Sequence, residues 1–325
     1  MQIQDVFQRY SDDLNRVEEC MEECLRSDIR LIPQIIHHII GSGGKRFRPL
    51  LLLAAADLCG YRGERRDNMS VVIEFVHTAT LLHDDVIDSA EIRRGSVSAN
   101  NIWGNAASVL VGDYLYSTAF KLMTADGNLA IMKLVSETTN TMSEGEIFQL
   151  VKCGKINLTE KEYLSIIEKK TSLLISTACA VGAILGNAPD AQIEALTRFG
   201  MRLGSAFQIT DDTLDYVAQE EDFGKAVGKD LAEGKITLPL IWVLKQCSAK
   251  EKNLIKKVVQ HKEAEGADQL LDIVALIDKY GGVNYALAKA KAYIDDGENL
   301  LRIFPDSDAK TSLLTISRYI IERRF

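Results

Sequence analysis

Proline, tryptophan and long apolar segments are scarce in this chain of 325 residues. Only 5 prolines interrupt it, while apolar residues make up 46% of it, a balance that excludes intrinsic disorder. Spanning a bilayer takes about 18 or more consecutive apolar residues. The longest candidates, residues 50–56 and 173–186, are too short or too mixed. We therefore expect no integral membrane segment.

Two further features are missing. The first ten residues lack a basic start followed by an apolar core, so we expect no secretion signal. Positive charge is not in excess either, because the net charge is −8, whereas proteins that bind nucleic acid usually have a basic balance. The sequence thus favours a cytoplasmic protein with a large buried core and no nucleic-acid partner.

Cysteine is present but not patterned. Cys20 and Cys24 share a helical face, yet no second Cys or His pair follows at the spacing of a metal site. We predict reduced thiols that serve in packing, as is usual in the cytoplasm. The six cysteines are Cys20, Cys24, Cys59, Cys153, Cys179 and Cys247.

Helical periodicity runs along most of the chain. Apolar residues recur at steps of three and four in residues 6–25, 31–40, 71–82, 105–123, 163–185 and 193–216. Thr159 with Glu162 forms a capping-box pattern, and Pro189-Asp190 opens the last of these runs. Strand-type alternation is almost absent. The breaks at 41–44, 60–68, 153–157 and 218–229 are too short for domain linkers, so we predict one all-α domain over residues 1–325.

Two acidic clusters stand out because they repeat one pattern. Asp84-Asp85-x-x-Asp88 and Asp211-Asp212-x-x-Asp215 each lie at the end of an apolar helical run. Residues four apart share a helix face, and two carboxylates so placed repel each other unless a cation lies between them. Magnesium typically takes one or two carboxylates together with phosphate oxygens of a substrate. The two clusters therefore predict a magnesium site for a diphosphate ester, with one cluster on each wall of a cavity.

Arginines accompany the first cluster and a glycine-rich basic segment precedes it. Arg93 and Arg94 follow the aspartates, where a planar guanidinium could bind a phosphate group in bidentate fashion. The segment 43–49, with Lys45, Arg46 and Arg48, lacks the spacing of a Walker loop. Alone it could be a solvated turn, and a single acidic cluster could be a helix end neutralised by a loop. Together these features indicate phosphate binding.

The second cluster is followed by a lysine-rich segment, 223–239, that could close over a bound phosphate. An exposed charged loop is the alternative. His77 lies two helical turns before Asp84 on the same face, and Lys170-Thr171 lies inside a helix. By themselves, these three residues fit packing or surface positions as well as a site.

The ordered motifs GGKRFRP, HTATLLHDDVID, RRG, KT, FQITDDTLD, GK and EGKITLPL resemble those of the trans-isoprenyl diphosphate synthases. The match covers roughly residues 40–240, and the residues around Ala79-Thr80 and 104–116 are most similar to bacterial long-chain, octaprenyl-type members. The resemblance implies a single helical bundle around a deep central cavity, working as a homodimer. It further implies Mg²⁺, with three ions per site when substrate is bound, and isopentenyl and allylic diphosphates (farnesyl or similar) as substrates.

The resemblance also implies a role for each matching residue. Asp84, Asp88 and Asp211 would hold the metal ions, supported by Asp85, Asp212 and Asp215. The allylic diphosphate would be bound by Arg93, Lys170, Thr171, Gln208, Lys225 and Lys235. Isopentenyl diphosphate would be bound by Lys45, Arg48, His77 and Arg94. The six aspartates, Lys170 and Lys235 would form the catalytic set, which promotes ionisation, condensation and elimination in that order.

Small residues before the first cluster bear on product length. Ala79, Thr80 and Val76 leave the helix face free of large rings, and Met123 is a candidate for the floor of the tunnel. A 20-residue helix is about 30 Å long, which is the scale of a product of about C30 to C40. Close helix packing would explain the small residues equally well. Release of so apolar a product could involve peripheral contact with a membrane.

Other activities stay open at this point. A shorter-chain, geranylgeranyl-type synthase would carry the same motifs. A class I terpene cyclase also ionises a diphosphate with aspartates, but it needs no isopentenyl site. A regulatory subunit of a synthase is a non-enzymatic alternative, although such a subunit could tolerate a broken acidic cluster and both clusters are intact here.

Overall fold

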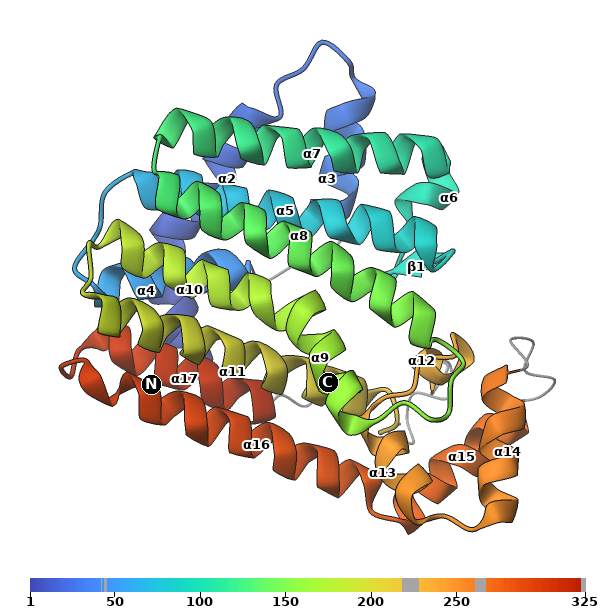
Figure 1. The fold of residues 1–325 in the computed structure, drawn as a ribbon. Helices are drawn as coiled ribbons and strands as arrows, with labels where there is room; N and C mark the ends of the chain where they lie inside the picture. Colours follow the sequence, from blue (N-terminus) through green and yellow to red (C-terminus); the bar gives the residue numbers. More distant parts are fainter. Residues whose placement is uncertain (42, 44–45, 218–227, 261–266, 323–325) are drawn as a thin grey trace. The chain divides into compact units, whose positions relative to one another are not determined.

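The computed structural model describes residues 1–41, 43, 46–217, 228–260 and 267–322. Within them the chain forms helix after helix and two very short strands (Figure 1), which confirms the all-α prediction. The chain divides into two compact units, each assembled from separate stretches. Unit 1 comprises Met1–Thr139, Leu174–Gly200 and Leu301–Ile316, and unit 2 comprises Asn140–Leu173, Met201–Leu300 and Ser317–Phe325. A single domain over residues 1–325 stays a prediction.

The helices and strands occur in the following order along the chain. The first half contains α1 (Ile3–Arg9), α2 (Ser11–Cys24), α3 (Leu31–Gly41), α4 (Phe47–Leu58), α5 (Arg65–Ile87), β1 (Ile92–Arg93), β2 (Ser96–Val97), α6 (Ala99–Trp103), α7 (Asn105–Asp126) and α8 (Leu129–Lys152). The second half contains α9 (Glu160–Ile167), the π-turn η1 (Glu168–Ser172), α10 (Leu173–Leu185), α11 (Asp190–Leu214), α12 (Lys229–Ala232), α13 (Leu238–Gln246), α14 (Ala249–Gln260), α15 (Ala267–Lys279), α16 (Gly282–Leu300), the 3₁₀ turn η2 (Leu301–Ile303) and α17 (Asp308–Glu322).

Helix α5 forms the centre of unit 1. It packs against α2, α4 and α7, and Figure 1 shows α5 and α7 side by side. The stretch from Val71 to Val76 is buried at every position, including its single charged residue, Glu74. A helix that is apolar on all sides belongs in a protein interior. This helix carries the first acidic cluster at its carboxyl end.

Two helix boundaries differ from the sequence prediction. The expected break at 60–68 is wrong in its second half, because α5 begins at Arg65. Arg66 and Asp67 are buried charges that would not fit an exposed loop, and both form ion pairs with α2: Nη2 of Arg66 lies 2.6 Å from Asp13, and Oδ2 of Asp67 lies 3.1 Å from Nε of Arg16. Paired in this way, the two charges can lie in the first turn of a buried helix.

The predicted helix over 6–25 is two helices. The break falls at Tyr10, which is 2% exposed and whose hydroxyl donates to Oδ2 of Asp57 on α4, at 3.2 Å. A periodic apolar pattern does not reveal this one-residue interruption, because apolar residues continue on both sides of it.

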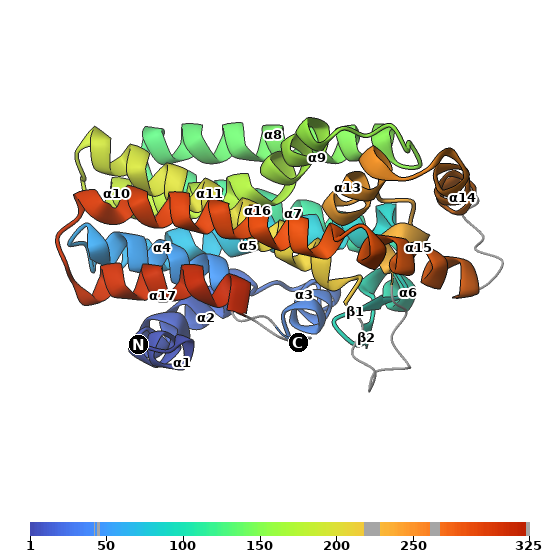
Figure 2. The same ribbon diagram turned by 90° about the horizontal axis from the view of Figure 1, so that it is seen from below.

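A β-hairpin that the sequence analysis did not predict follows α5 (Figure 2). Ile92 pairs with Val97 and Arg93 with Ser96, so Arg94 and Gly95 form a two-residue turn. Both turn residues have positive φ, 51° for Arg94 and 80° for Gly95, as a type I′ turn requires. The hairpin fixes where the two arginines of the RRG motif lie.

The predicted helix over 163–185 contains a π-turn, which lies in unit 2. The capping box of Thr159 and Glu162 is confirmed and begins α9 at Glu160. The helix then widens, with the N–H of Leu173 donating to the carbonyl of Glu168, five residues earlier. The carboxylate of Glu160 joins α9 to α13 and α16 through hydrogen bonds from Lys245, Tyr285 and Lys289.

All six cysteines are free, as expected, although Cys179 alone is fully buried. In the part of the chain that the structure describes, no helix is both long enough and apolar enough to cross a membrane.

Candidate functional site

The first acidic cluster lies where α5 ends. The N–H of Asp88 donates to the carbonyl of Asp84 at 2.8 Å, so the backbone stays helical and the two side chains share a face. Asp84 and Asp88 are half-buried, whereas Asp85 is 1% exposed. Oδ1 of Asp85 accepts a hydrogen bond from Nε of Arg93 at 2.5 Å. The outer two carboxylates are thus accessible, and the middle one holds Arg93.

In the second acidic cluster, in unit 2, the first aspartate is again accessible and the middle one buried. Asp211 is exposed, while Asp212 is buried and accepts hydrogen bonds from the hydroxyl of Tyr163 and from Nε2 of Gln208, both at 2.6 Å. Burial raises the pKa of Asp212 to about 6, although these two hydrogen bonds oppose the rise. Oδ2 of Asp215 accepts from the backbone N–H of Asp230 at 3.0 Å.

The contrast between accessible and buried aspartates bears on metal binding. Among the described residues, no group of three or more His, Cys, Asp or Glu side chains lies close enough together to hold a metal ion by itself. Magnesium does not need such a cage, because it keeps several waters and is completed by substrate phosphates. Accessible carboxylates at Asp84, Asp88 and Asp211 are hard oxygen donors of the kind that magnesium prefers. The residues present therefore fit the ion.

Arginines and a histidine gather in unit 1 around Glu74. Arg48 lies in the first turn of α4, His77 on α5 and Arg94 in the hairpin turn, where it donates to the carbonyl of Gly43. Loss of water and the charges of Arg48 and Arg94 lower the pKa of His77 well below its usual value, so the ring is neutral near pH 7. Burial lowers the pKa of Arg48 to about 10, which still leaves it charged.

The carboxylate of Glu74 lies among these cations. Burial raises the pKa of Glu74, and Arg46, Arg48 and Arg94 oppose that rise. Arg46 itself caps α4 with φ of 45° and pairs with Glu18, so it serves the protein rather than a ligand. Nε of Arg48 is buried and has no hydrogen-bond partner among the described residues. Lys45, the fourth predicted member of this group, lies outside the described residues.

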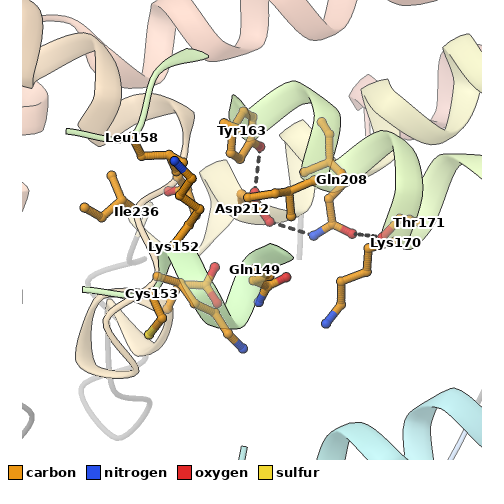
Figure 3. A pocket seen from close by; sticks show the side chains of 15 residues that line it. Gln149, Lys152, Cys153, Leu158, Tyr163, Lys170, Thr171, Gln208, Asp212 and Ile236 are labelled. Atoms are coloured by element: carbon orange, nitrogen blue, oxygen red, sulfur yellow. Dashed lines mark hydrogen bonds between the residues drawn. The ribbon is translucent and has the colours of Figure 1, made fainter. Parts of the chain in front are cut away.

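A pocket in unit 2 gathers most of the second predicted group (Figure 3). Lys170, Thr171, Gln208 and Lys235 all line it, together with Asp212. Oγ1 of Thr171 donates to Oε1 of Gln208 at 2.8 Å, so a chain of hydrogen bonds connects Thr171, Gln208, Asp212 and Tyr163 (Figure 3). The other polar residues of the wall are Gln149, Lys152, Cys153, Tyr163, Asp230 and Thr237. Lys225 lies outside the described residues.

The lysines of this pocket are paired with glutamates. Nζ of Lys170 lies 2.8 Å from a carboxylate oxygen of Glu146, and Nζ of Lys235 lies 2.7 Å from Glu233. Lys152 pairs with Glu162 in the same way. A diphosphate could take the place of a glutamate at such a lysine, since phosphate oxygens are strong acceptors for charged donors.

Sequence reasoning missed Glu74, Tyr163 and Asp230 as parts of these sites. Glu74 had a signal, because it is a lone charge within an apolar helical run three residues before His77. Tyr163 had none beyond its place at the start of a helix. Asp230 lies within the predicted lysine-rich segment 223–239, and burial together with Asp212 and Asp215 raises its pKa well above the usual value.

The residues predicted to set product length lie on α5 and α7. Val76 and Ala79 are fully buried, and Met123 is 1% exposed. Thr80 is half-buried, and its hydroxyl donates to the carbonyl of His77 at 2.7 Å. Their role stays a prediction.

Comparison with known proteins gives one consistent result. Residues 29–277 match the polyprenyl synthetase family. An octaprenyl diphosphate synthase of Haemophilus influenzae is 37% identical over 323 residues, covering 99% of this chain and 97% of that protein. The crystal structure of a decaprenyl diphosphate synthase from Rhodobacter capsulatus is similar, with a TM-score of 0.94, 37% identity and 98% of each chain covered.

A second crystal structure is a polyprenyl synthase from Caulobacter crescentus, complexed with calcium and isoprenyl diphosphate. Its TM-score is 0.94 and its identity 35%, over 100% of this chain and 98% of that one. The family match covers most of the chain and the relatives extend over nearly all of it. This chain belongs to the polyprenyl synthetase family and is a prenyltransferase enzyme with an all-α isoprenoid-synthase fold.

Proposed function

We propose that this enzyme condenses an allylic diphosphate, farnesyl or similar, with successive molecules of isopentenyl diphosphate to give a long all-trans polyprenyl diphosphate. The observation that carries the proposal is the shared design of the two acidic clusters. In each, the first aspartate is accessible, and the middle one is buried and hydrogen-bonded to a diphosphate-binding candidate, Arg93 or Gln208. Both clusters then serve one reaction on one diphosphate.

The arginine and histidine group of unit 1 would bind isopentenyl diphosphate. Arg48 and Arg94 provide charge and Lys45 adds to it, while the buried Nε of Arg48 has a donor to offer. His77 is neutral, so it can donate one hydrogen bond to a phosphate oxygen without adding charge. By binding the diphosphate end, these residues would hold the nucleophilic double bond in position for the reaction.

The unit 2 pocket would bind the allylic diphosphate through Lys170, Thr171, Gln208 and Lys235. Arg93 and Lys225 are the other proposed ligands of this diphosphate. The allylic C–O bond breaks, and the diphosphate leaves with the electron pair. Bound Mg²⁺, three ions per site and held by Asp84, Asp88 and Asp211, would neutralise charge on the leaving group. The lysines stabilise the same charge.

Condensation follows when the double bond of isopentenyl diphosphate attacks the allylic cation and forms a new C–C bond. A proton is then lost. We propose that it goes to the released diphosphate, since none of the carboxylates named above is placed as an uncommitted base. The hydrogen bond between Thr171 and Gln208 fixes these two side chains at the pocket where we propose that the diphosphate is bound.

For product length we propose about C30 to C40, on the scale of the helix along which the chain would grow. Ala79 is fully buried on α5, and a phenylalanine there would occupy the proposed tunnel. We expect Ala79→Phe to shorten the product by several units with little loss of stability. If Ala79 instead lies in a close-packed core with no tunnel beside it, overpacking would destabilise the fold by about 1–3 kcal/mol and leave the product unchanged. Chromatography of the product and thermal unfolding distinguish the two.

One incubation tests the function itself. The enzyme is mixed with farnesyl diphosphate, labelled isopentenyl diphosphate and Mg²⁺, and the products are separated by chain length. A ladder ending at one long product supports the proposal. A C20 end product would indicate a geranylgeranyl-type synthase, a cyclic hydrocarbon a class I terpene cyclase, and no turnover a regulatory subunit, and each of these outcomes would reject it.

Assembly and location are part of the proposal. The apolar side chains of Val109, Leu110 and Phe120 on α7 are 37%, 67% and 39% exposed, which supports a homodimer that covers them. Sedimentation at micromolar concentration would test it, and a monomer would contradict it. We further propose cytoplasmic location, with peripheral membrane contact at most during product release.

A further inference from the structure

The π-turn η1 is a backbone irregularity at the pocket of unit 2. The N–H of Leu173 donates to the carbonyl of Glu168, five residues earlier. Oγ of Ser172 likewise donates to the carbonyl of Ile167, at 3.2 Å. Such turns occur mostly as single inserted turns, frequently at functional sites. This one contains Lys170 and Thr171, which are neighbours in sequence and both line the pocket.

The two side chains leave the turn toward different helices. Lys170 reaches Glu146 on α8, whereas Thr171 reaches Gln208 on α11. Neighbouring residues of a regular α-helix point about 100° apart, and an inserted turn shifts that relation. The place of both side chains at the pocket therefore depends on how this widened turn is held.

Two glycines contact the turn, one on α8 and one on α11. A methyl group built on Gly204 of α11 would lie 2.4 Å from Cα and 2.9 Å from Cβ of Ser172. A methyl group built on Gly145 of α8 would lie 2.7 Å from Cβ of Lys169 and 3.2 Å from the backbone nitrogen of Lys170. All three distances to carbon are shorter than real contacts allow, so no other residue fits at either position unless the turn moves. Apart from proline, glycine is the residue least favourable to helices, yet both positions are inside long helices.

We propose that Gly145 and Gly204 are positioning residues for the allylic diphosphate, because they let α8 and α11 approach the π-turn closely enough to fix Lys170 and Thr171 at the pocket. The inference rests on the proposed function of those two side chains. Hydrogen bonding between Oγ of Ser172 and Oγ of Ser205, at 3.1 Å, strengthens the contact on the α11 side.

The chain offers a matched control on the same helix. Gly200 lies one turn before Gly204, and a methyl group there would lie 2.6 Å from Cα of Ser176 and 2.9 Å from the carbonyl oxygen of Ile175. Gly200→Ala therefore introduces a similar clash against α10, away from the π-turn. Its effect on folding should match that of Gly204→Ala, whereas its effect on the pocket should not.

The experiment measures kcat and the KM of each substrate separately, with farnesyl and isopentenyl diphosphates, in folded samples checked by thermal unfolding. We expect Gly204→Ala to lower kcat/KM for farnesyl diphosphate by about 10- to 100-fold, the scale of a small misplacement of a binding group. The KM for isopentenyl diphosphate should change by less than about twofold, because that substrate is assigned to residues of unit 1. Gly145→Ala should show the same pattern more weakly, and it decides the question if Gly204→Ala does not fold.

Two results would overturn the proposal: a Gly204→Ala enzyme with the farnesyl kinetics of Gly200→Ala, or one that loses affinity for both substrates equally. Lys170→Ala separates this claim from the proposed function. If Lys170→Ala leaves the KM for farnesyl diphosphate unchanged, the assignment of the allylic site itself is wrong. If Lys170→Ala raises it while both glycine variants are silent, only the positioning role is rejected.

Discussion

The two candidate diphosphate-binding regions solve the same electrostatic problem in different ways. In unit 1, Arg48 and Arg94 crowd with a neutral His77 around one buried carboxylate, Glu74. In unit 2, Lys152, Lys170 and Lys235 each have a glutamate of their own. One region concentrates charge around a shared partner, and the other distributes it in separate pairs.

The difference follows from the chemistry of the two cations. A guanidinium stays protonated when water is removed, so arginines can be brought together in the interior, whereas a lysine in the same place readily loses its proton. Burial lowers the pKa of Arg48 to about 10, which leaves this guanidinium protonated near pH 7. Lysines suit the more open pocket, where a glutamate can keep each one charged and give way to a phosphate.

The largest expected effect tests whether both regions serve one reaction. Asp84→Ala in unit 1 and Asp211→Ala in unit 2 should each lower kcat by about 1000-fold or more, because each removes an accessible carboxylate that supports neutralisation of the leaving group. Circular dichroism should show an intact fold for both. Turnover that survives either change, under saturating Mg²⁺, would show that this cluster is not part of the chemistry.

A second prediction exchanges the two cations. Arg48→Lys should lower kcat/KM for isopentenyl diphosphate by about 30-fold, through loss of a charge-assisted hydrogen bond of about 2 kcal/mol. A lysine has a lower ordinary pKa than an arginine, and the burial that lowers the pKa of Arg48 would lower that of a lysine further toward neutrality. The defect should therefore grow as the pH rises above neutrality, because the ammonium then loses its proton.

The reciprocal variant is the control. Lys170→Arg keeps the charge in the more open pocket and should change kcat/KM for farnesyl diphosphate by less than about threefold. If Lys170→Arg is the more damaging change, or if the Arg48→Lys defect does not depend on pH, the contrast between the two regions is wrong.

A third prediction concerns the internal support of the second cluster. Tyr163→Phe removes the hydroxyl that donates to Asp212, and Gln208 still holds the other oxygen. We expect about a fivefold fall in kcat/KM for farnesyl diphosphate, since one of two hydrogen bonds to the carboxylate is lost. Tyr216→Phe is the matched control: it removes a buried hydroxyl that accepts from Thr237, and its kinetics should stay near those of the parent enzyme.

The smallest expected effect is on stability, and it follows from a contrast between the carboxylates of Glu74 and Glu160. The pKa of Glu74 is raised by burial. Burial also opposes ionisation of Glu160, but hydrogen bonds from Lys245, Lys289 and Tyr285 outweigh it and lower the pKa of Glu160 to about 2. A lowered pKa contributes stability above the unfolded-state value, 4.5, which is lost as the pH falls toward 2.

Glu160→Gln should therefore cost about 1–2 kcal/mol of unfolding free energy at pH 7 and progressively less between pH 4.5 and 2. Urea unfolding at several pH values measures it. A deficit that is constant across that range would mean that the charge of Glu160 contributes nothing, and that shape alone accounts for the loss.

Helical content and most boundaries could be predicted from the sequence because they depend on local signals. The capping box at Thr159 and Glu162 and the start of α11 at Asp190 were both found. The hairpin around Arg94 and Gly95 was not, since its strands have only two residues each and leave no alternation to detect. The π-turn escaped for a similar reason: an inserted residue does not disturb an apolar pattern over so few positions.

The residues of the candidate site were proposed from the sequence, whereas the different environment of each was not predicted. Every described residue of the predicted allylic set on unit 2 lines one pocket, and Arg48, His77 and Arg94 interact in unit 1. Spacing places the first and last aspartates of a cluster on one helix face, but it does not tell which carboxylates are buried. Burial and hydrogen bonding distinguish Asp85 and Asp212 from their accessible neighbours, and both depend on distant partners.

By itself, the sequence determined the all-α class, the identity of the charged residues and their order along the helices, because helix periodicity and motif spacing are local properties of the chain. Tertiary structure alone decided that Arg46 pairs with Glu18, that Tyr163 supports Asp212, and that two glycines admit a widened turn. Each of these depends on contacts between residues more than twenty positions apart, and such contacts form only when packing brings separate helices together.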